Sequence, residues 1–209
     1  MKKLMDKLLS KIKLNKKIFV FLIVIFFIAF ISGSILFVLL DQSDKTITTN
    51  YLNSFMNTML ESKINYFQIL TNSLISSIIL VFGIWLLGIS VIGIPVILFL
   101  YFSQVFTFGF MLSSIFLSYK FKGGIFAFIY TFPHYLIFLI TLLILTTYSI
   151  LLSIKLITAI IQKKQLDFKL IFNKYLFILL FSIVSVIICS LCETFVFTNI
   201  IKLIAPFFK

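Results

Sequence analysis

The segment Trp85-Leu-Leu-Gly88-Ile-Ser-Val-Ile-Gly93-Ile-Pro95 lies inside a run from Ile64 to Tyr119 that contains no Asp, Glu, Lys or Arg. A helix needs about 20 apolar residues to cross the roughly 30 Å hydrocarbon core of a bilayer. The run is long enough for two such helices, and its two glycines and its proline mark the connection between them. The sequence therefore predicts a helical hairpin in a membrane.

The composition is that of an integral membrane protein. Of the 209 residues, 62% are hydrophobic and 11% are charged, whereas soluble domains contain about 25% charged residues. All 18 basic residues are Lys, and the lack of Arg counts against bidentate recognition of phosphate or carboxylate groups. The Lys residues that give the net charge of +12 are concentrated beside apolar stretches. This pattern is typical of cytoplasmic loops and favours contact with anionic lipid rather than with nucleic acid.

Five apolar stretches are predicted to cross the membrane as one helical domain, residues 18–209, after a basic cytoplasmic tail, residues 1–17. The predicted spans are 18–40, 74–87, 95–117, 125–156 and 175–201. With this topology 12 Lys lie inside and six lie outside, so the N-terminus is expected in the cytoplasm and the C-terminus outside. The predicted fold class is therefore an all-α integral membrane protein, a bundle of about five transmembrane helices.

The outer segment 41–72 is the longest polar stretch of the chain. From about Ile47, apolar residues recur at helical spacing between Asn53, Asn57 and Glu61. We expect an amphipathic helix on the outer membrane surface or against the bundle. Its function is open at this point, because it suits both a partner surface and a solvated connector.

Small residues and a proline are expected to shape two of the spans. Ala29 and Gly33 share one face of the first span, which suits close helix packing. The fourth span, 125–156, is too long for a straight crossing. A kink at Pro133, a tilt or a cytoplasmic extension is expected to absorb the excess length.

The connection within the hairpin is unusually apolar for a loop in water. Gly88 and Gly93 are expected to adopt backbone angles that other residues resist, and Pro95 suits the first turn of a helix. Irregular backbone at membrane depth needs protein or water to satisfy its polar groups. The turn is therefore expected to be partly buried, or to dip into the membrane where neighbouring helices shield it.

Three polar residues within the predicted spans could form a site: Gln104, His134 and Glu193. Ionisable residues in spans are costly and are functional candidates by default. His134 and Glu193 are each expected about 12–15 Å from the outer surface, close to the depth of Gln104. One hypothesis is a proton- or substrate-responsive site. The other is a structural hydrogen-bond lock between the third, fourth and fifth spans, with Glu193 protonated or paired with His134.

The sequence contains no recognisable catalytic set. It has one His and lacks the HExxH, GxSxG, P-loop and dinucleotide-binding patterns. Cys189 and Cys192 fall late in an apolar helix and are interpreted as core residues. We therefore expect no enzyme activity, no metal and no cofactor.

The turn segment resembles the signature of the stage II sporulation protein M family. Three weaker similarities accompany it: the segment Tyr51–Lys63, the pair Pro133-His134, and Glu193 followed by Thr-Phe-Val. Together they extend the resemblance from about residue 18 to about residue 200. The chain departs from wider family members at Tyr135 and Phe138, where those carry Gly and Glu, so no role of that second carboxylate is transferred.

The resemblance implies a five-span protein of an endospore-forming Gram-positive bacterium. It implies a non-catalytic membrane scaffold or anchor that recruits or localises the peptidoglycan-degrading stage II sporulation proteins D and P. The implied setting is engulfment of the forespore, in the mother-cell membrane at the engulfing septum. The docking surfaces would then be residues 41–72 and 118–124. The alternative is a small transporter or channel subunit with a polar intramembrane site. The oligomeric state, a homo-oligomer included, stays open.

Overall fold

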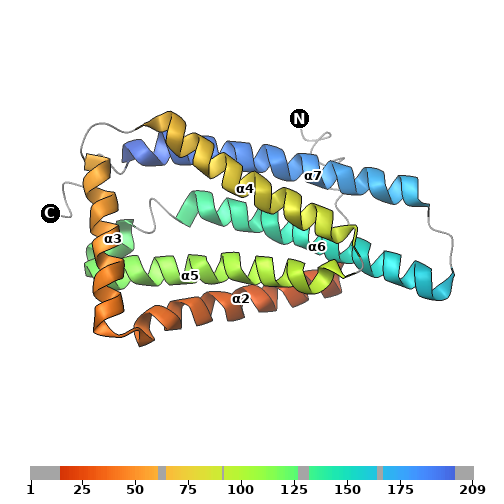
Figure 1. The fold of residues 1–209 in the computed structure, drawn as a ribbon, viewed down its shortest axis with the longest axis horizontal. Coiled ribbons are helices and arrows are strands. Elements are labelled where there is room, and N and C mark those ends of the chain that lie inside the picture. Colours follow the sequence, from red (N-terminus) through yellow and green to blue (C-terminus); the bar gives the residue numbers. More distant parts are fainter. Residues whose placement is uncertain (1–14, 61–64, 91, 127–131, 164–166, 201–209) are drawn as a thin grey trace.

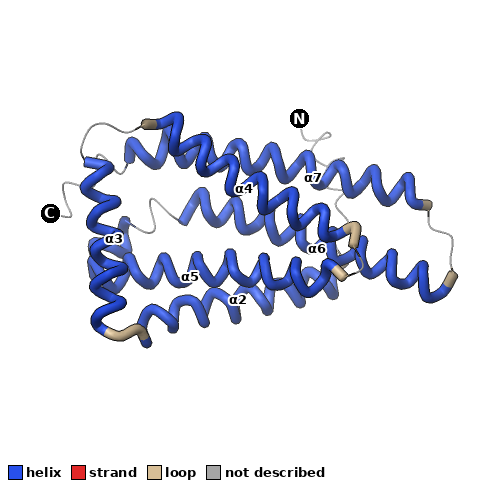
Figure 2. Tube along the Cα trace, viewed as in Figure 1, coloured by secondary structure: helices blue, strands red, loops and turns tan. Residues whose placement is uncertain are grey.

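The computed structural model describes residues 15–60, 65–90, 92–126, 132–163 and 167–200, and these are helical apart from short connections (Figures 1 and 2). Five of the helices are long and apolar enough to cross a membrane, which confirms the predicted fold class. The helices are α2 (Lys16–Leu39), α3 (Gln42–Leu60), α4 (Tyr66–Gly88), α5 (Gly93–Phe126), α6 (Phe132–Gln162) and α7 (Phe168–Leu191), followed by a π-helical segment (Cys192–Phe197).

The five spanning helices lie lengthwise beside one another, and α3 lies across one end of the bundle (Figure 1). We call this the α3 end. At the opposite end, α6 and α7 project beyond the other helices (Figure 1). Helices α2, α5 and α7 run towards the α3 end, and α4 and α6 run away from it.

Helix α2 packs most closely on α5, through small residues. Ala29 is fully buried and Gly33 is buried beside it. A Cβ atom on Gly33 would overlap the carbonyl oxygen of Phe106, and one on Gly109 would likewise overlap a backbone oxygen of α2. The Ser34 hydroxyl donates across the gap to the Gly109 carbonyl at 3.2 Å. The close packing predicted for this face of the first span is confirmed, and small residues are what permit it.

The second span begins earlier than predicted, at Tyr66 instead of residue 74. Asn65 caps it, because its side-chain oxygen accepts a hydrogen bond from the backbone N–H of Gln68 at 3.2 Å. The predicted outer segment 41–72 is therefore α3 followed by the first turns of α4. Helix α3 lies where a helix was expected, and its placement on a membrane surface stays a prediction.

The connection between the third and fourth spans also differs from its prediction. Helix α5 continues through residues 118–124 to Phe126, with a break at Lys120, where φ is 53°. Helix α6 begins at Phe132, after residues that lie outside the described part. Pro133 thus occupies the first turn, where its missing N–H leaves no helical bond unmade. It starts the helix instead of kinking it, and α6 takes up the excess length by running to Gln162.

The close approach of α2 and α5 can be tested by a pair of identical substitutions. Gly33→Ala is expected to lower the stability by about 1–3 kcal/mol, because the added methyl group meets backbone that cannot move alone. The control is Gly83→Ala, whose Cβ meets nothing within 4 Å. The measurement is the unfolding midpoint in detergent, and equal midpoints for the two variants would contradict the close-packed interface.

Candidate functional site

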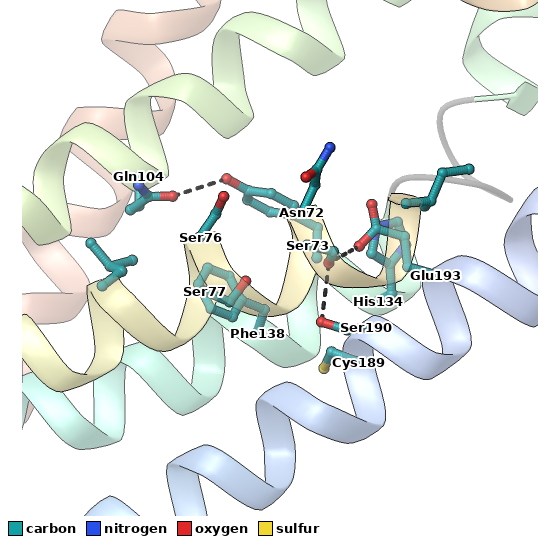
Figure 3. Close-up of a pocket in the computed structure, with 13 residues that line it drawn as sticks. Asn72, Ser73, Ser76, Ser77, Gln104, His134, Phe138, Cys189, Ser190 and Glu193 are labelled. Carbon is teal, nitrogen blue, oxygen red and sulfur yellow. Dashed lines mark hydrogen bonds between the residues drawn. The ribbon is translucent and has the colours of Figure 1, made fainter. Parts of the chain in front are cut away.

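A pocket of about 490 Å³ lies among α4, α5, α6 and α7, in the half of the bundle nearer α3 (Figure 3). Apolar side chains and Cys189 form part of its wall. Its polar lining comes from all four helices and the π-helical segment: Asn72, Ser73, Ser76, Ser77, Gln104, His134, Tyr135, Ser190 and Glu193.

All three polar residues singled out from the sequence line this one pocket. Gln104 comes from α5, His134 from α6 and Glu193 from the π-helical segment. His134 is the third residue of α6, so it lies near a helix end rather than the predicted ten residues within a span. Its side chain is 8% exposed. The structure brings the three residues together, and their function stays a prediction.

Glu193 is hydrogen-bonded to α4. The Ser73 hydroxyl lies 2.6 Å from Glu193 Oε2 and 3.0 Å from Ser190 Oγ (Figure 3). A hydroxyl has one hydrogen to donate and two lone pairs with which to accept. The single hydrogen of Ser73 therefore points to one of these two oxygens at a time. The three side chains form a continuous polar chain between α4 and the end of α7.

Gln104 is bonded to α6 in the same pocket. The Tyr135 hydroxyl donates to Gln104 Oε1 at 3.2 Å (Figure 3). The Tyr135 ring stacks on Phe108 of α5, with ring centroids 5.0 Å apart. The hydrogen bonds of the pocket thus join α4 to α7 and α5 to α6. The carboxylate of Glu193 accepts a hydrogen bond from Ser73, and its predicted pairing with His134 stays a prediction.

The helix that carries Glu193 is locally widened. Residues Cys192–Phe197 are π-helical, and the Thr198 hydroxyl donates to the Glu193 carbonyl at 3.0 Å. Single π-helical turns are rare and occur frequently at functional sites. The irregular backbone and the ionisable side chain of α7 therefore coincide at the pocket.

The polar face of α4 was not predicted from the sequence. Asn72, Ser73, Ser76 and Ser77 recur at helical spacing and line the pocket. Asn72 and Ser76 are exposed, so they lie at the mouth of the pocket. The repeat of small polar residues at positions i and i+4 was the available signal. The predicted outer segment, 41–72, included Asn72, and the predicted span began at residue 74, after Ser73.

The turn between α4 and α5 forms a second polar centre, and its backbone is satisfied by α6. Ser153 is fully buried, and its hydroxyl lies 2.9 Å from the Gly88 carbonyl oxygen and 3.1 Å from that of Ser90. Gly88 and Gly93 are buried, while Ile92 is exposed. The turn is thus partly buried and shielded by a neighbouring helix, as predicted.

Tyr175 of α7 supports the same turn. Its hydroxyl donates to the Trp85 carbonyl at 2.7 Å and lies 2.8 Å from the Ser149 hydroxyl. The Tyr175 ring stacks on the Trp85 indole, with centroids 5.5 Å apart. A Cβ atom on Gly88 would overlap the Tyr175 hydroxyl. Gly88 therefore matters because it lets α6 and α7 reach the end of α4.

The backbone angles expected at the two glycines are not found. No described glycine has a positive φ. A Cβ atom on Gly93 would overlap the carbonyl oxygen of Leu87. Both glycines are thus required by close approach and not by left-handed backbone. Pro95 lies in the first turn of α5, as predicted.

The described residues hold no group of three or more His, Cys, Asp or Glu side chains that could bind a metal ion. Cys189 is buried, Cys192 is partly buried, and both are free thiols. The chemistry available at the pocket is therefore that of hydroxyl, amide and imidazole groups around one carboxyl group.

The polar support of the turn can be tested with two tyrosines. Tyr175→Phe leaves a buried carbonyl and a buried hydroxyl without their partner, so it is expected to cost about 1–3 kcal/mol. Tyr148→Phe is the matched control, because the Tyr148 hydroxyl is buried and has no hydrogen-bond partner among the described residues. Thermal unfolding in detergent measures the stability of both variants. An equal loss of stability in Tyr148→Phe and Tyr175→Phe would refute the assignment.

Comparison with known proteins gives one match. No curated protein and no solved structure matches the chain. Residues 18–197, which cover nearly all of the five spanning helices together with the pocket and the turn, match the family model described as stage II sporulation protein M. The chain therefore belongs to the stage II sporulation protein M family.

Proposed function

We propose that this sporulation-related membrane protein is a non-catalytic scaffold that recruits or localises peptidoglycan-degrading proteins during engulfment of the forespore. The family match carries the proposal. The expected partners are the stage II sporulation proteins D and P, which the resemblance of the turn segment implies. The structural support is helix α3, which lies across one end of the bundle where a partner outside the membrane could reach it (Figure 1).

Helix α3 has the exposure expected of a docking surface. Tyr51 is 75% exposed, and Ile47 and Phe55 are also exposed. Aromatic residues are enriched among the side chains that dominate binding energy at interfaces. Its polar residues add hydrogen-bonding groups between these apolar ones.

Hydrogen bonds hold α3 in place against the bundle. The Thr49 hydroxyl lies 3.1 Å from that of Ser118, and the Tyr119 hydroxyl donates to Asn53 Oδ1 at 2.7 Å. Both contacts join α3 to the end of α5. A helix fixed in this way presents its exposed side chains in one orientation, which reduces the entropy lost on binding.

The charge distribution supports an orientation with the α3 end outside the cell. Lys155, Lys169 and Lys174 are exposed on the parts of α6 and α7 nearest the opposite end. Lys residues beside spans concentrate on the cytoplasmic side, where they also contact anionic lipid. The proposed location is the mother-cell membrane at the engulfing septum, with α3 facing the cell wall.

The orientation can be tested by labelling single cysteines. Cys189→Ala and Cys192→Ala remove the native thiols, and Asn50→Cys or Gln162→Cys then introduces an exposed one. A membrane-impermeant maleimide is expected to label Asn50→Cys in intact cells and Gln162→Cys only after permeabilisation. The reverse pattern would place α3 in the cytoplasm and would refute the proposed docking to wall enzymes.

The scaffold function can be tested by capture from membranes of sporulating cells. The tagged wild-type protein is expected to recover proteins D and P. Tyr51→Ala is expected to reduce recovery about tenfold or more, as loss of an aromatic hot spot costs about 2 kcal/mol. The control is Ile161→Ala, which changes a similarly exposed residue at the opposite end.

Two results would contradict this proposal, the first its docking position and the second the scaffold function itself. Equal recovery by Tyr51→Ala and the wild type would refute docking at this position of α3. Failure of the wild-type protein to recover either enzyme, together with normal engulfment in deletion cells, would refute the scaffold itself.

The pocket favours a second candidate function, that of a small transporter or channel subunit. Its polar lining reaches from the α3 end to Gln104, near the middle of α5. Discontinuous or irregular helices at polar intramembrane sites are typical of transporters, and Glu193 lies in such a segment. Solute uptake or conductance by the reconstituted protein would support this candidate. Vesicles that contain the protein but show neither uptake nor conductance would exclude it.

A further inference from the structure

We propose that a groove between α6 and α7, at the end of the bundle opposite α3, binds an anionic phospholipid through Lys155, Lys169 and Lys174. We call it the lysine groove. The inference goes beyond the functions proposed above, because it assigns a ligand to a part of the molecule that neither docking at α3 nor the pocket at Glu193 uses.

The lysine groove consists of two adjoining pockets between α6 and the start of α7. One has a volume of about 530 Å³ and the other a volume of about 80 Å³, and they share Tyr148, Leu170 and Lys174. Helices α6 and α7 project beyond the other helices at this end (Figure 1). Leu170 and Asn173 are exposed. The groove is therefore open to the surroundings of the bundle.

Positive charge predominates along the lysine groove. Lys169 and Lys174 line the larger pocket, and Lys155 and Lys174 line the smaller one. All three side chains are exposed. Asp167 is the one acidic residue of the described lining, so the lysines outnumber it. A Lys ammonium offers three donors, and charge-assisted hydrogen bonds to phosphate oxygens are among the strong ones. The lining therefore suits an anion such as a phosphate group.

The lysines lie near the ends of two candidate spans, where lipid headgroups are. Lys169 is the first residue of the last span, and Lys155 lies seven residues before the end of the preceding span at Gln162. At about 1.5 Å per residue, Lys155 and Lys174 are roughly 10 Å and 7.5 Å inside these ends. A Lys side chain at such a depth extends its ammonium group towards the boundary between lipid and water. The positive charges thus reach the level of the phosphates.

The inner part of the lysine groove is apolar. Phe177 lies about two helical turns further along α7 than Lys169, and the neighbouring Ile178 is 2% exposed. Leu170, between the lysines, lines both pockets. A charged rim at the water boundary with an apolar wall behind it has the same order as the headgroup and acyl chain of a lipid. A free phosphate ion would leave this wall uncovered, and the ligand is therefore a lipid.

The test uses the purified full chain and two lipids that both contain a phosphate group. Native mass spectrometry compares phosphatidylglycerol, which carries a net negative charge, with phosphatidylcholine, whose quaternary ammonium offsets its phosphate. About a tenfold or greater preference for phosphatidylglycerol is expected, because each Lys beside an anionic headgroup contributes about fivefold to the affinity. Equal binding of the two lipids would overturn the proposal.

Calorimetry with inorganic phosphate distinguishes the lipid from a soluble anion. The proposal expects the preference for phosphatidylglycerol whether or not phosphate alone binds weakly. Saturable binding of phosphate together with equal binding of the two lipids would assign the lysines to a soluble anion and would overturn the lipid site.

A pair of double substitutions assigns the preference to the lysine groove. Lys169→Gln with Lys174→Gln removes two charges from the groove and is expected to reduce the preference about tenfold or more. The matched control is Lys16→Gln with Lys17→Gln, which removes two exposed charges from the start of α2 at the same end of the bundle (Figure 1). Undiminished preference in the groove variant would overturn the proposal. An equal loss in the control would also overturn it, because the lipid would then respond to the charge of the whole end.

The outcomes separate this inference from the functions proposed above. A chain that recovers proteins D and P but binds the two lipids equally refutes the lysine groove alone. A chain that prefers phosphatidylglycerol, loses this preference only in the groove variant and recovers neither enzyme keeps the groove and counts against the scaffold.

Discussion

The bundle depends on the satisfaction of backbone polar groups where the chain reverses between α4 and α5. An apolar turn without water must find hydrogen-bond donors within the protein. Ser153 of α6 supplies one for the carbonyls of Gly88 and Ser90, and Tyr175 of α7 supplies another for Trp85. These bonds attach the hairpin to both later helices. The arrangement of all four helices around the pocket follows from that attachment.

Close approach of backbones is the second requirement of this arrangement. Gly88 leaves room for the Tyr175 hydroxyl, and Gly33 leaves room for the backbone of α5. In lipid, helices gain little from hiding apolar side chains, so packing and interhelical hydrogen bonds hold them together. The glycines therefore stabilise the bundle through the close helix contacts that they allow. The glycines of this turn are therefore required by close approach, since no described glycine has a positive φ.

The five spans were predictable because charge-free apolar stretches of this length have few alternatives in water or lipid. Their ends were harder to predict. Asn65 starts α4 among polar residues that hydropathy assigns to a loop, and two of the polar residues that follow, Asn72 and Ser73, line the pocket. Pro133 suits both a kink and a helix start, and only the neighbouring structure distinguishes the two.

The pocket was only partly predictable for a related reason. Gln104, His134 and Glu193 stand out in apolar sequence, so their common location could be anticipated. The partners that bind them could not. Serines are frequent in membrane helices, and hydrophobicity gives Ser73 no more weight than the lipid-facing positions around it. Pairing of Ser73 with Glu193, across more than a hundred residues of sequence, requires the three-dimensional packing of α4 on α7.

A purely structural role would not require a carboxyl group at position 193. Neutral hydroxyl pairs already link helices in this bundle: Thr141 with Ser185 at 2.7 Å, and Ser73 with Ser190 at 3.0 Å. An acidic side chain at the same place costs about 2.5–3.5 kcal/mol in the middle of a membrane helix, and less near an end or a polar cavity. The carboxyl group adds this cost to a contact that Ser190 makes without it. Helix packing alone therefore does not account for a carboxyl group at this position.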